Sequence, residues 1–348
     1  MNNLPKTMRG VWLVGHGSMD KLEIRLDIPI PSPGPCDVLI RVTAAGVNNT
    51  DINTRLAWYS KNKGANEDAS WSGQPIKFPR IQGADVCGHI IAVGRKVNTD
   101  RINERVLIEP CIREANGKIL DQPWYFGSEC DGGFAEFTIV AARHAHKIES
   151  ELSDVQLASF PCSYSTAENL LTRSNVKSGE RILVTGASGG VGSAAVQLAK
   201  ARGAYVWAMA SPAKLDAVRE LGADETISRE ADLNVIPGSN SLDVVIDLVA
   251  GKKWPQYLEV LRPSGRYAVA GAIAGPLVEL DVRTLYLKDL SLFGCTVLEP
   301  EVFKNLVNLI ERAIIKPIVA QTFTLEEICE AQTLFMKKEH VGKIVLKI

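Results

Sequence analysis

The chain has 348 residues, of which 46% are hydrophobic and 23% charged, a composition typical of globular proteins with a large buried core. Lys and Arg number 39, and Asp and Glu number 40, so no net positive field draws the chain to nucleic acid or to an anionic membrane. No segment approaches the roughly 20 consecutive apolar residues that a membrane-spanning helix requires. We therefore expect neither nucleic acid nor a membrane as a partner.

The N-terminal residues, MNNLPKTMRGVWLVG, lack the basic start and the apolar run of a secretory signal. The seven cysteines are scattered, odd in number and never spaced as a CxxC pair. Such usage is typical of free thiols in a reducing compartment. These features predict a cytoplasmic protein.

The first 150 residues predict short strands separated by turns. Strands are expected at 38–42, 89–94 and 105–108, which are rich in Val, Leu and Ile. Two long segments, 58–79 and 111–133, are predicted as irregular loops, and they are either passive connectors or walls of a binding pocket.

After about residue 150 the pattern changes to an alternation of apolar strands and amphipathic helices. Ser153 is placed to cap a helix at 154–160, and a second helix is expected at 165–173. The strands that follow are expected at 181–185, 205–209, 225–227, 243–247, 266–270 and 290–293. Helices at 191–202 and 212–221 lie between them, which predicts βαβ units and a parallel sheet.

The tail from Pro317 predicts a strand, a helix at 326–338 and a closing strand at 343–347. We therefore expect an α/β protein with two domains. A β-rich domain of residues 1–150 and 315–348 is interrupted by a doubly wound domain of residues 151–314.

A glycine-rich turn stands between the strand expected at 181–185 and the helix that follows. The segment from Gly186 to Gly192 reads GASGGVG, so that Ser188, Gly189, Gly190, Val191 and Gly192 form the turn and the first turn of the helix. Gly189 would let the backbone approach a pyrophosphate, and Gly192 would let the helix pack closely on the sheet. Free N–H groups at the helix start favour phosphate. Strand, turn and helix together predict a dinucleotide site.

The choice of cofactor depends on the end of the next strand, where an NAD site places Asp or Glu for the ribose 2′-hydroxyl. This chain has no acid there, and it offers Ser211 and Lys214 instead. Arg229, after the third strand, adds a second cation. Hydroxyl and cationic groups suit the 2′-phosphate of NADP, so the sequence favours NADP(H).

At this point the residues resemble the medium-chain dehydrogenase/reductase superfamily, and within it the zinc-independent quinone oxidoreductase and zeta-crystallin branch. The markers are AGVNNTD at 45–51, GADVCG at 83–88, GGFAE at 132–136, VKSGE at 176–180, the 186–192 turn and GKIVL at 342–346. The resemblance implies a GroES-like catalytic domain made from both chain ends, an inserted Rossmann domain, and a homodimer or homotetramer.

The same resemblance bears on metal binding. Zinc alcohol dehydrogenases of the superfamily have Cys at the position of Asn48, His at that of Ala84 and Cys at that of Cys162. A catalytic zinc needs about three protein ligands, and only Cys162 remains. The structural zinc lobe would fall near Cys111 and Cys130, the only two cysteines there. On a strand His144 and His146 would share a face, for which a solvated edge or packing is the expected role. We expect no metal.

Roles for single residues also follow from the resemblance. Asn48 would lie near the nicotinamide and the substrate oxygen, with Thr50 and Asp51 beside it as further catalytic candidates, and Thr50 would relay a proton. Alternatively, Asn48 and Asp51 only hydrogen-bond their turn. Tyr59 or Tyr164 would replace a missing family tyrosine. Further cofactor contacts are expected from Thr166, Gly271, Ala272, Ile273, Phe293, Gly294 and Lys343, the last at the pyrophosphate.

Without zinc, hydride transfer suits an acceptor whose π system spreads the arriving charge, so a quinone or an α,β-unsaturated carbonyl is the expected small-molecule substrate. Two alternatives stay open. One is an alcohol dehydrogenase of the same superfamily with unusual or no zinc, and the other is a cofactor-binding protein without catalysis.

Overall fold

A computed structural model of the chain describes residues 4–61 and 69–348. It consists of two compact units, one formed by Met1–Cys162 with Pro317–Ile348 and the other by Ser163–Lys316. The insertion of one domain into another agrees with the expectation, but the boundary differs. Residues 151–162 were expected in the doubly wound domain and belong to the first unit, because the helix at 154–157 packs on its strands.

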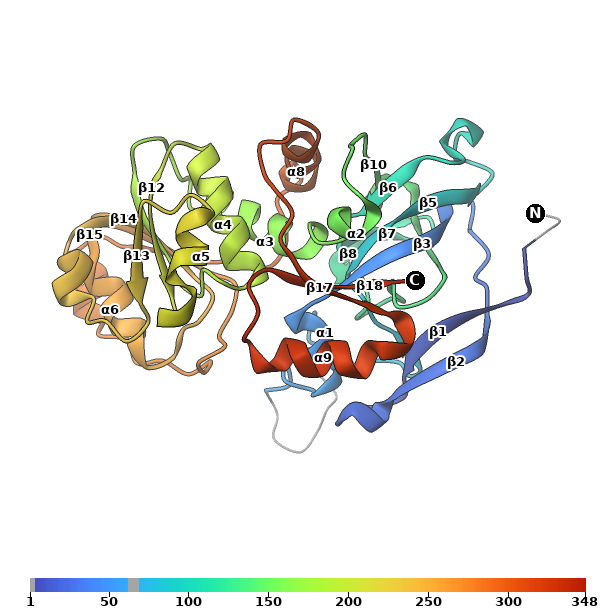
Figure 1. The fold of residues 1–348 in the computed structure, drawn as a ribbon, viewed down its shortest axis with the longest axis horizontal. Coiled ribbons are helices and arrows are strands. Elements are labelled where there is room, and N and C mark those ends of the chain that lie inside the picture. Colours follow the sequence, from blue (N-terminus) through green and yellow to red (C-terminus); the bar gives the residue numbers. More distant parts are fainter. Residues whose placement is uncertain (1–3, 62–68) are drawn as a thin grey trace. The chain divides into compact units, whose positions relative to one another are not determined.

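The first unit is built mainly of strands (Figure 1). Its largest sheet has the order β10-β6-β5-β3-β18-β17, with β9 paired to β3, and a small sheet has the order β2-β1-β4. The strands are β1 Thr7–Leu13, β2 Leu22–Pro29, β3 Asp37–Val47, β4 Arg80–Ile81, β5 Asp85–Val93, β6 Arg105–Ile108, β9 Phe137–Ala141, β10 Ala145–Lys147, β17 Val319–Thr324 and β18 Lys343–Lys347. The helices are α1 Asn49–Arg55, α2 Asp154–Leu157 and α9 Ile328–Lys337.

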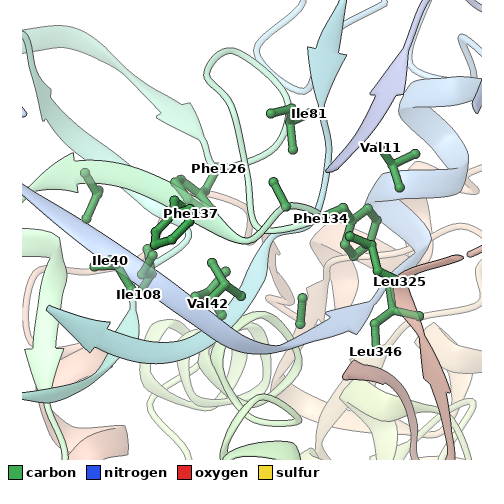
Figure 2. Packing of buried hydrophobic residues seen from close by; sticks show 14 of the residues in the cluster. Val11, Ile40, Val42, Ile81, Ile108, Phe126, Phe134, Phe137, Leu325 and Leu346 are labelled. Atoms are coloured by element: carbon green, nitrogen blue, oxygen red, sulfur yellow. The ribbon is translucent and has the colours of Figure 1, made fainter. Parts of the chain in front are cut away.

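The core of this unit joins the two ends of the chain. Ile40 and Val42 of β3, Leu346 of β18 and Phe134 are buried in one cluster, which Figure 2 shows between the strands. β18 pairs antiparallel with β3, so a strand near the C-terminus lies beside a strand near the N-terminus in one sheet. Burial of apolar surface at about 25 cal/mol per Å² therefore ties the C-terminal tail to the N-terminal strands.

The segment 111–133 is not the irregular loop that we predicted. Its first part is a β-hairpin of β7 Cys111–Ala115 and β8 Lys118–Tyr125, paired antiparallel. The turn between them is Asn116-Gly117, and both residues have positive φ (53° and 70°). That geometry belongs to the two-residue hairpin turn for which Asn-Gly is the strongest sequence signal. In the segment 58–79, residues 62–68 lie outside the described part, and the rest carries no strand or helix.

The second unit holds a six-stranded parallel sheet in the order β13-β12-β11-β14-β15-β16. The strands are β11 Arg181–Val184, β12 Tyr205–Ala210, β13 Glu225–Ser228, β14 Leu242–Asp247, β15 Leu261–Val269 and β16 Ser291–Gly294. The helices are α3 Pro161–Arg173, α4 Gly190–Ala201, α5 Leu215–Glu220, α6 Trp254–Glu259, α7 Val282–Leu287 and α8 Val302–Glu311, the first of which begins at the boundary of the units.

The chain order reverses between β11 and β14, which are neighbours in the sheet. In open parallel sheets, ligands bind beyond the carboxyl ends of the strands at such a reversal. The expected α/β architecture, with a doubly wound sheet inserted into a β-rich domain, is confirmed. No helix in residues 4–61 and 69–348 is long and apolar enough to cross a membrane.

Candidate cofactor and catalytic sites

The glycine-rich turn begins at the carboxyl end of β11, beside the reversal point. Gly192 packs so closely that a Cβ there would lie 2.2 Å from the carbonyl oxygen of Gly186. Gly189 differs, because a Cβ there would meet only that same oxygen, at 3.5 Å, and the residue is exposed. α4 begins at Gly190, and its first N–H groups have no acceptor within the helix. The turn therefore offers open backbone and free donors, as a pyrophosphate requires.

Ser211, Lys214 and Arg229 all lie beyond the carboxyl ends of two neighbouring strands. Ser211 follows β12 directly, and Lys214 donates its N–H to the Ser211 carbonyl at 2.9 Å. Arg229 follows β13, which pairs with β12, and its N–H donates to the carbonyl of Ala210 at 2.8 Å. Its guanidinium is exposed and lies 3.1 Å from Glu230. Sheet pairing thus places Lys214 and Arg229 on the same edge of the sheet, although fifteen residues separate them in the sequence.

The ends of β15 and β16 carry the other residues expected at the cofactor. Gly271, Ala272 and Ile273 follow β15, while Phe293 and Gly294 end β16, which pairs with it. A cavity of about 270 Å³ lies here, lined among others by Ala272, Phe293, Gly294 and Ala250. Thr166 lies on α3 and is half-buried. The structure thus places the expected residues of the glycine turn and of β12, β13, β15 and β16 along one edge of the sheet.

The first unit contains a buried polar cluster of Asn48, Asp85 and Lys343. The Lys343 ammonium lies 2.7 Å from Asp85 Oδ2 and donates to the carbonyl of Val47 at 3.0 Å and to Asn48 Oδ1. The Asn48 amide donates to Asp85 Oδ2 at 2.8 Å and to the Gly46 carbonyl at 3.3 Å. Lys343 is 2% exposed. Its ammonium binds three oxygens of the first unit, and the expected contact with a pyrophosphate stays a prediction.

The same contacts bear on the expected role of Asn48. Both amide protons are donated to protein oxygens, and the amide oxygen accepts from Lys343. Asn48 therefore has no free donor for a substrate oxygen in this structure. Of the two roles considered from the sequence, the geometry agrees with the one in which Asn48 orders its surroundings.

Asp51 lies beneath this cluster at the start of α1. Its carboxylate accepts from the backbone N–H of Asn48 at 2.8 Å and from that of Gly83 at 3.1 Å. Burial raises the pKa of Asp51 to about 7, although the Asn48 N–H and the Lys343 ammonium both lower it. Asp51 thus joins α1 to the segment before β5, which agrees with an ordering role.

Of the three positions that the family resemblance relates to zinc ligands, Asn48 belongs to the polar cluster, and Ala84 and Cys162 lie in an apolar one. Ala84 and Cys162 pack with Tyr125, and Trp71 stacks on Tyr125 with ring centroids 5.0 Å apart. Burial raises the pKa of the Cys162 thiol to about 12, and the thiol lies 3.0 Å from the Tyr125 hydroxyl. A methyl group, an amide bound to Lys343 and a neutral thiol do not fit a catalytic zinc ion. Across the described ranges, no group of three or more His, Cys, Asp or Glu could hold a metal ion.

Thr50 and Tyr59 lie at the half-buried border of this region. Burial raises the pKa of Tyr59, and its hydrogen bonds with Thr50 and Asn53 lower it. The Tyr59 hydroxyl therefore keeps its proton at neutral pH. Tyr164 is different: its hydroxyl donates to the Lys316 carbonyl at 2.6 Å, and the side chain is 1% exposed. Of the two expected tyrosines, Tyr59 is therefore the better candidate for a proton donor, because the buried Tyr164 hydroxyl already donates to a carbonyl.

His144 and His146 both contact Glu109, at 3.2 Å and 3.4 Å. Against the effect of burial, these hydrogen bonds lower the pKa of Glu109 to about 2. The second ring nitrogen of His144 accepts from the backbone N–H groups of Arg113 and Glu114. The pair thus fastens the hairpin β7–β8 to β10, which agrees with the expected packing role.

Tyr125 is a site residue that we did not anticipate from the sequence. It ends β8, in the segment predicted as a loop, and no motif marks it. The Asn116-Gly117 turn was the available signal, since a hairpin there places Tyr125 opposite Cys111. Its contact with Cys162 joins residues 37 positions apart and could not be read from spacing.

Both units are similar to domains of known proteins. Residues 34–150 match the alcohol dehydrogenase GroES-like domain, and residues 190–312 match the zinc-binding dehydrogenase domain. The chain is 30% identical to an NAD-dependent alcohol dehydrogenase of Sulfurisphaera tokodaii, covering 97% of this chain and 99% of that one. It is 29% identical to the human quinone oxidoreductase, covering 98% of each.

The same relationship is visible in solved structures. The crystal structure of a protein described as an alcohol dehydrogenase of Sinorhizobium meliloti 1021 superposes with a TM-score of 0.93 at 45% identity, covering 100% of this chain and 98% of that chain. The similarity extends over both units. The chain therefore belongs to the medium-chain dehydrogenase/reductase superfamily and is an oxidoreductase with a GroES-like and a Rossmann domain.

Proposed function

We propose that the protein is an NADPH-dependent, zinc-independent reductase that transfers hydride to a quinone or an α,β-unsaturated carbonyl. One observation carries the proposal, namely the side chains at the three positions that the family resemblance relates to zinc ligands. They are the lysine-bound amide of Asn48, the methyl group of Ala84 and the protonated thiol of Cys162. Without a metal, an unactivated alkoxide lacks the stabilisation that zinc gives it. An acceptor with an extended π system spreads the arriving charge itself.

The preference for NADPH rests on the ends of β12 and β13. Ser211 stands where an NAD enzyme holds a carboxylate, and Lys214 and Arg229 lie on the same edge of the sheet. A carboxylate repels a 2′-phosphate, whereas a hydroxyl and two cations bind it. When bound, the cofactor supplies the hydride, and the glycine turn binds and orients it.

We propose that Tyr59 donates the proton that the reduced substrate takes up. Reduction of a quinone or enone leaves an oxyanion that takes up a proton, and the half-buried Tyr59 hydroxyl retains its proton at neutral pH. Thr50, hydrogen-bonded to Tyr59, provides the next hydroxyl along this path. Trp71, stacked on Tyr125, offers an aromatic surface for a planar acceptor.

We also propose that the protein forms a homodimer through the second unit. β16 is the edge strand of its sheet, and large apolar side chains near it are exposed: Leu277 is 93% and Leu287 71% exposed. An unpaired edge beside exposed apolar groups is suited to pairing with an identical strand across a twofold axis. Sedimentation of the purified protein tests this, and a monomer at micromolar concentration would contradict it.

A panel of substrates tests the reaction. We expect NADPH oxidation with quinones and enones, and no increase in rate when zinc is added to the purified enzyme. NAD-dependent oxidation of simple alcohols that requires one tightly bound zinc per chain would favour the alcohol dehydrogenase alternative. Cofactor binding without turnover across the panel would favour the non-catalytic one.

A further inference from the structure

A buried carboxylate joins the loops at the carboxyl edge of the parallel sheet. Asp247 ends β14 and is completely buried. Its Oδ1 accepts from the Thr185 hydroxyl at 2.6 Å and from the Val249 N–H at 2.9 Å, and its Oδ2 accepts from the Tyr267 hydroxyl at 2.5 Å. These donors come from the residue that follows β11, from β15 and from the loop after β14. One side chain thus fixes three strands of the cofactor edge.

The fourth donor is the N–H of Ala250, which lies 3.1 Å from Oδ2 and 3.2 Å from Oδ1 of Asp247. Ala250 has φ 54° and ψ −137°, a conformation that glycine adopts readily and alanine does not. Such strain persists only where the surroundings hold it, and it occurs often at ligand-binding sites. The two carboxylate oxygens of Asp247 face the strained peptide and are therefore the groups that hold it.

The strained loop contacts both neighbouring loops of the cofactor edge. Val249 packs against Gly186, where a Cβ would lie 3.2 Å from Val249 Cγ2. The Val249 carbonyl accepts from the Ala274 N–H at 2.9 Å. Gly271 lies so close that a Cβ would be 2.7 Å from the Leu248 carbonyl oxygen. A change in the loop 248–250 therefore displaces the glycine turn and the loop after β15 together.

We propose that Asp247 is a positioning residue of the cofactor site. It holds Ala250 in its strained conformation and thereby sets the spacing between the glycine turn and the loop at 271–274. Asp247 does not itself touch the cofactor. The inference rests on the proposed function, because this spacing matters for NADPH binding only if the protein binds NADPH at this edge of the sheet.

The test compares Asp247→Asn with the double variant Asp247→Asn/Ala250→Gly. The amide keeps the size of the carboxylate but has only one accepting oxygen for four donors, so Ala250 is released. We expect the Kd for NADPH to rise about tenfold, the effect of losing a buried charge-assisted hydrogen bond. Glycine adopts the required φ without strain, so Ala250→Gly should return the Kd to within about threefold of the wild-type value.

Binding is measured by fluorescence titration well below the midpoint of thermal unfolding, and unfolding is recorded for every variant. Tyr267→Phe removes one donor and should weaken NADPH binding, whereas the matched Tyr257→Phe, in the same buried cluster, should not. If Asp247→Asn does not fold, Tyr267→Phe and Thr185→Val carry the test.

Folded Asp247→Asn with wild-type affinity would overturn the inference and leave the proposed function intact. A weakened Asp247→Asn that Ala250→Gly stabilises without restoring affinity would also overturn it, because Asp247 would then act on the fold alone. Wild-type protein that binds neither NADPH nor NADH would overturn the proposed function, and the inference with it.

Discussion

The Lys343 ammonium lies 2.7 Å from Oδ2 of Asp85, and both side chains are almost entirely buried. The ammonium also donates to Asn48, the position that the family resemblance relates to a zinc-ligating cysteine, so a lysine supplies the cation of this cluster. Breaking a buried ion pair by removing one partner leaves an uncompensated charge. The pair therefore holds the closing strand to the residues around Asn48.

Removal of the ammonium should destabilise the protein. We expect Lys343→Met to lower the free energy of unfolding by about 3–5 kcal/mol, because Asp85 is left buried without a cation. The double variant Lys343→Met/Asp85→Asn should recover part of this loss. Urea unfolding measures both values, and a single variant as stable as the wild type would show that the pair contributes little.

The raised pKa of Asp51 predicts a pH dependence of stability. The folded-state pKa of about 7 exceeds the value near 4 of an exposed aspartate, so between these pH values the folded protein holds a proton that the unfolded chain has released. This contribution to stability is complete below pH of about 4 and is lost as the pH rises through 7. The free energy of unfolding should therefore fall between about pH 4 and pH 7 and level off above pH 7. Asp51→Asn should reduce that slope; equal slopes in the two proteins would refute the assignment.

Two glycines of the turn should respond differently to alanine. In Gly192→Ala the new Cβ would lie 2.2 Å from the Gly186 carbonyl oxygen, so we expect a clear fall in the temperature of unfolding. Gly189 has φ −77° and room for a Cβ, so Gly189→Ala should unfold like the wild type. It should bind NADPH more weakly, because in our proposal the open face of Gly189 receives the pyrophosphate. Calorimetry and fluorescence titration distinguish the two effects. Equal losses of stability in both variants would contradict this account.

Substitution of Lys214 tests whether this residue recognises the 2′-phosphate of NADPH. We expect Lys214→Ala to weaken NADPH binding by about 1–3 kcal/mol, the scale of a charge-assisted contact, and to leave NADH binding almost unchanged. The matched variant Lys252→Ala removes a cation from the loop after β14 and should leave the ratio of the two affinities as it was. If Lys214→Ala weakens both nucleotides equally, Lys214 does not recognise the phosphate.

The sequence predicted the Rossmann unit well, because its signals are local. Continuous runs of Val, Ile and Leu mark β11 and β14, and the glycine spacing marks the turn between β11 and α4. The closing strand at 343–347 has the predicted bounds for the same reason. In each case neighbouring residues decide the conformation.

The polar cluster and the Asp247 network could not be predicted in this way. Lys343 and Asn48 are 295 positions apart, and Asp247 meets Thr185 across 62 positions. A lysine that begins an apolar strand favours a solvent-exposed role on sequence grounds, and only the pairing of β18 with β3 places it beside Val47. The boundary near residue 150 differs for a similar reason. α2 belongs to the first unit because it packs on strands of that unit, and its own sequence does not reveal this packing.

The most direct test of the account is the steady-state kcat/KM for reduction of 1,4-benzoquinone, measured with NADPH and with NADH on one preparation. A preference worth 1–3 kcal/mol predicts a ratio of about 5 to 150 in favour of NADPH. The account also predicts that this activity survives prolonged treatment with a zinc chelator. An equal or greater kcat/KM with NADH, or loss of activity on chelation that zinc restores, would contradict it.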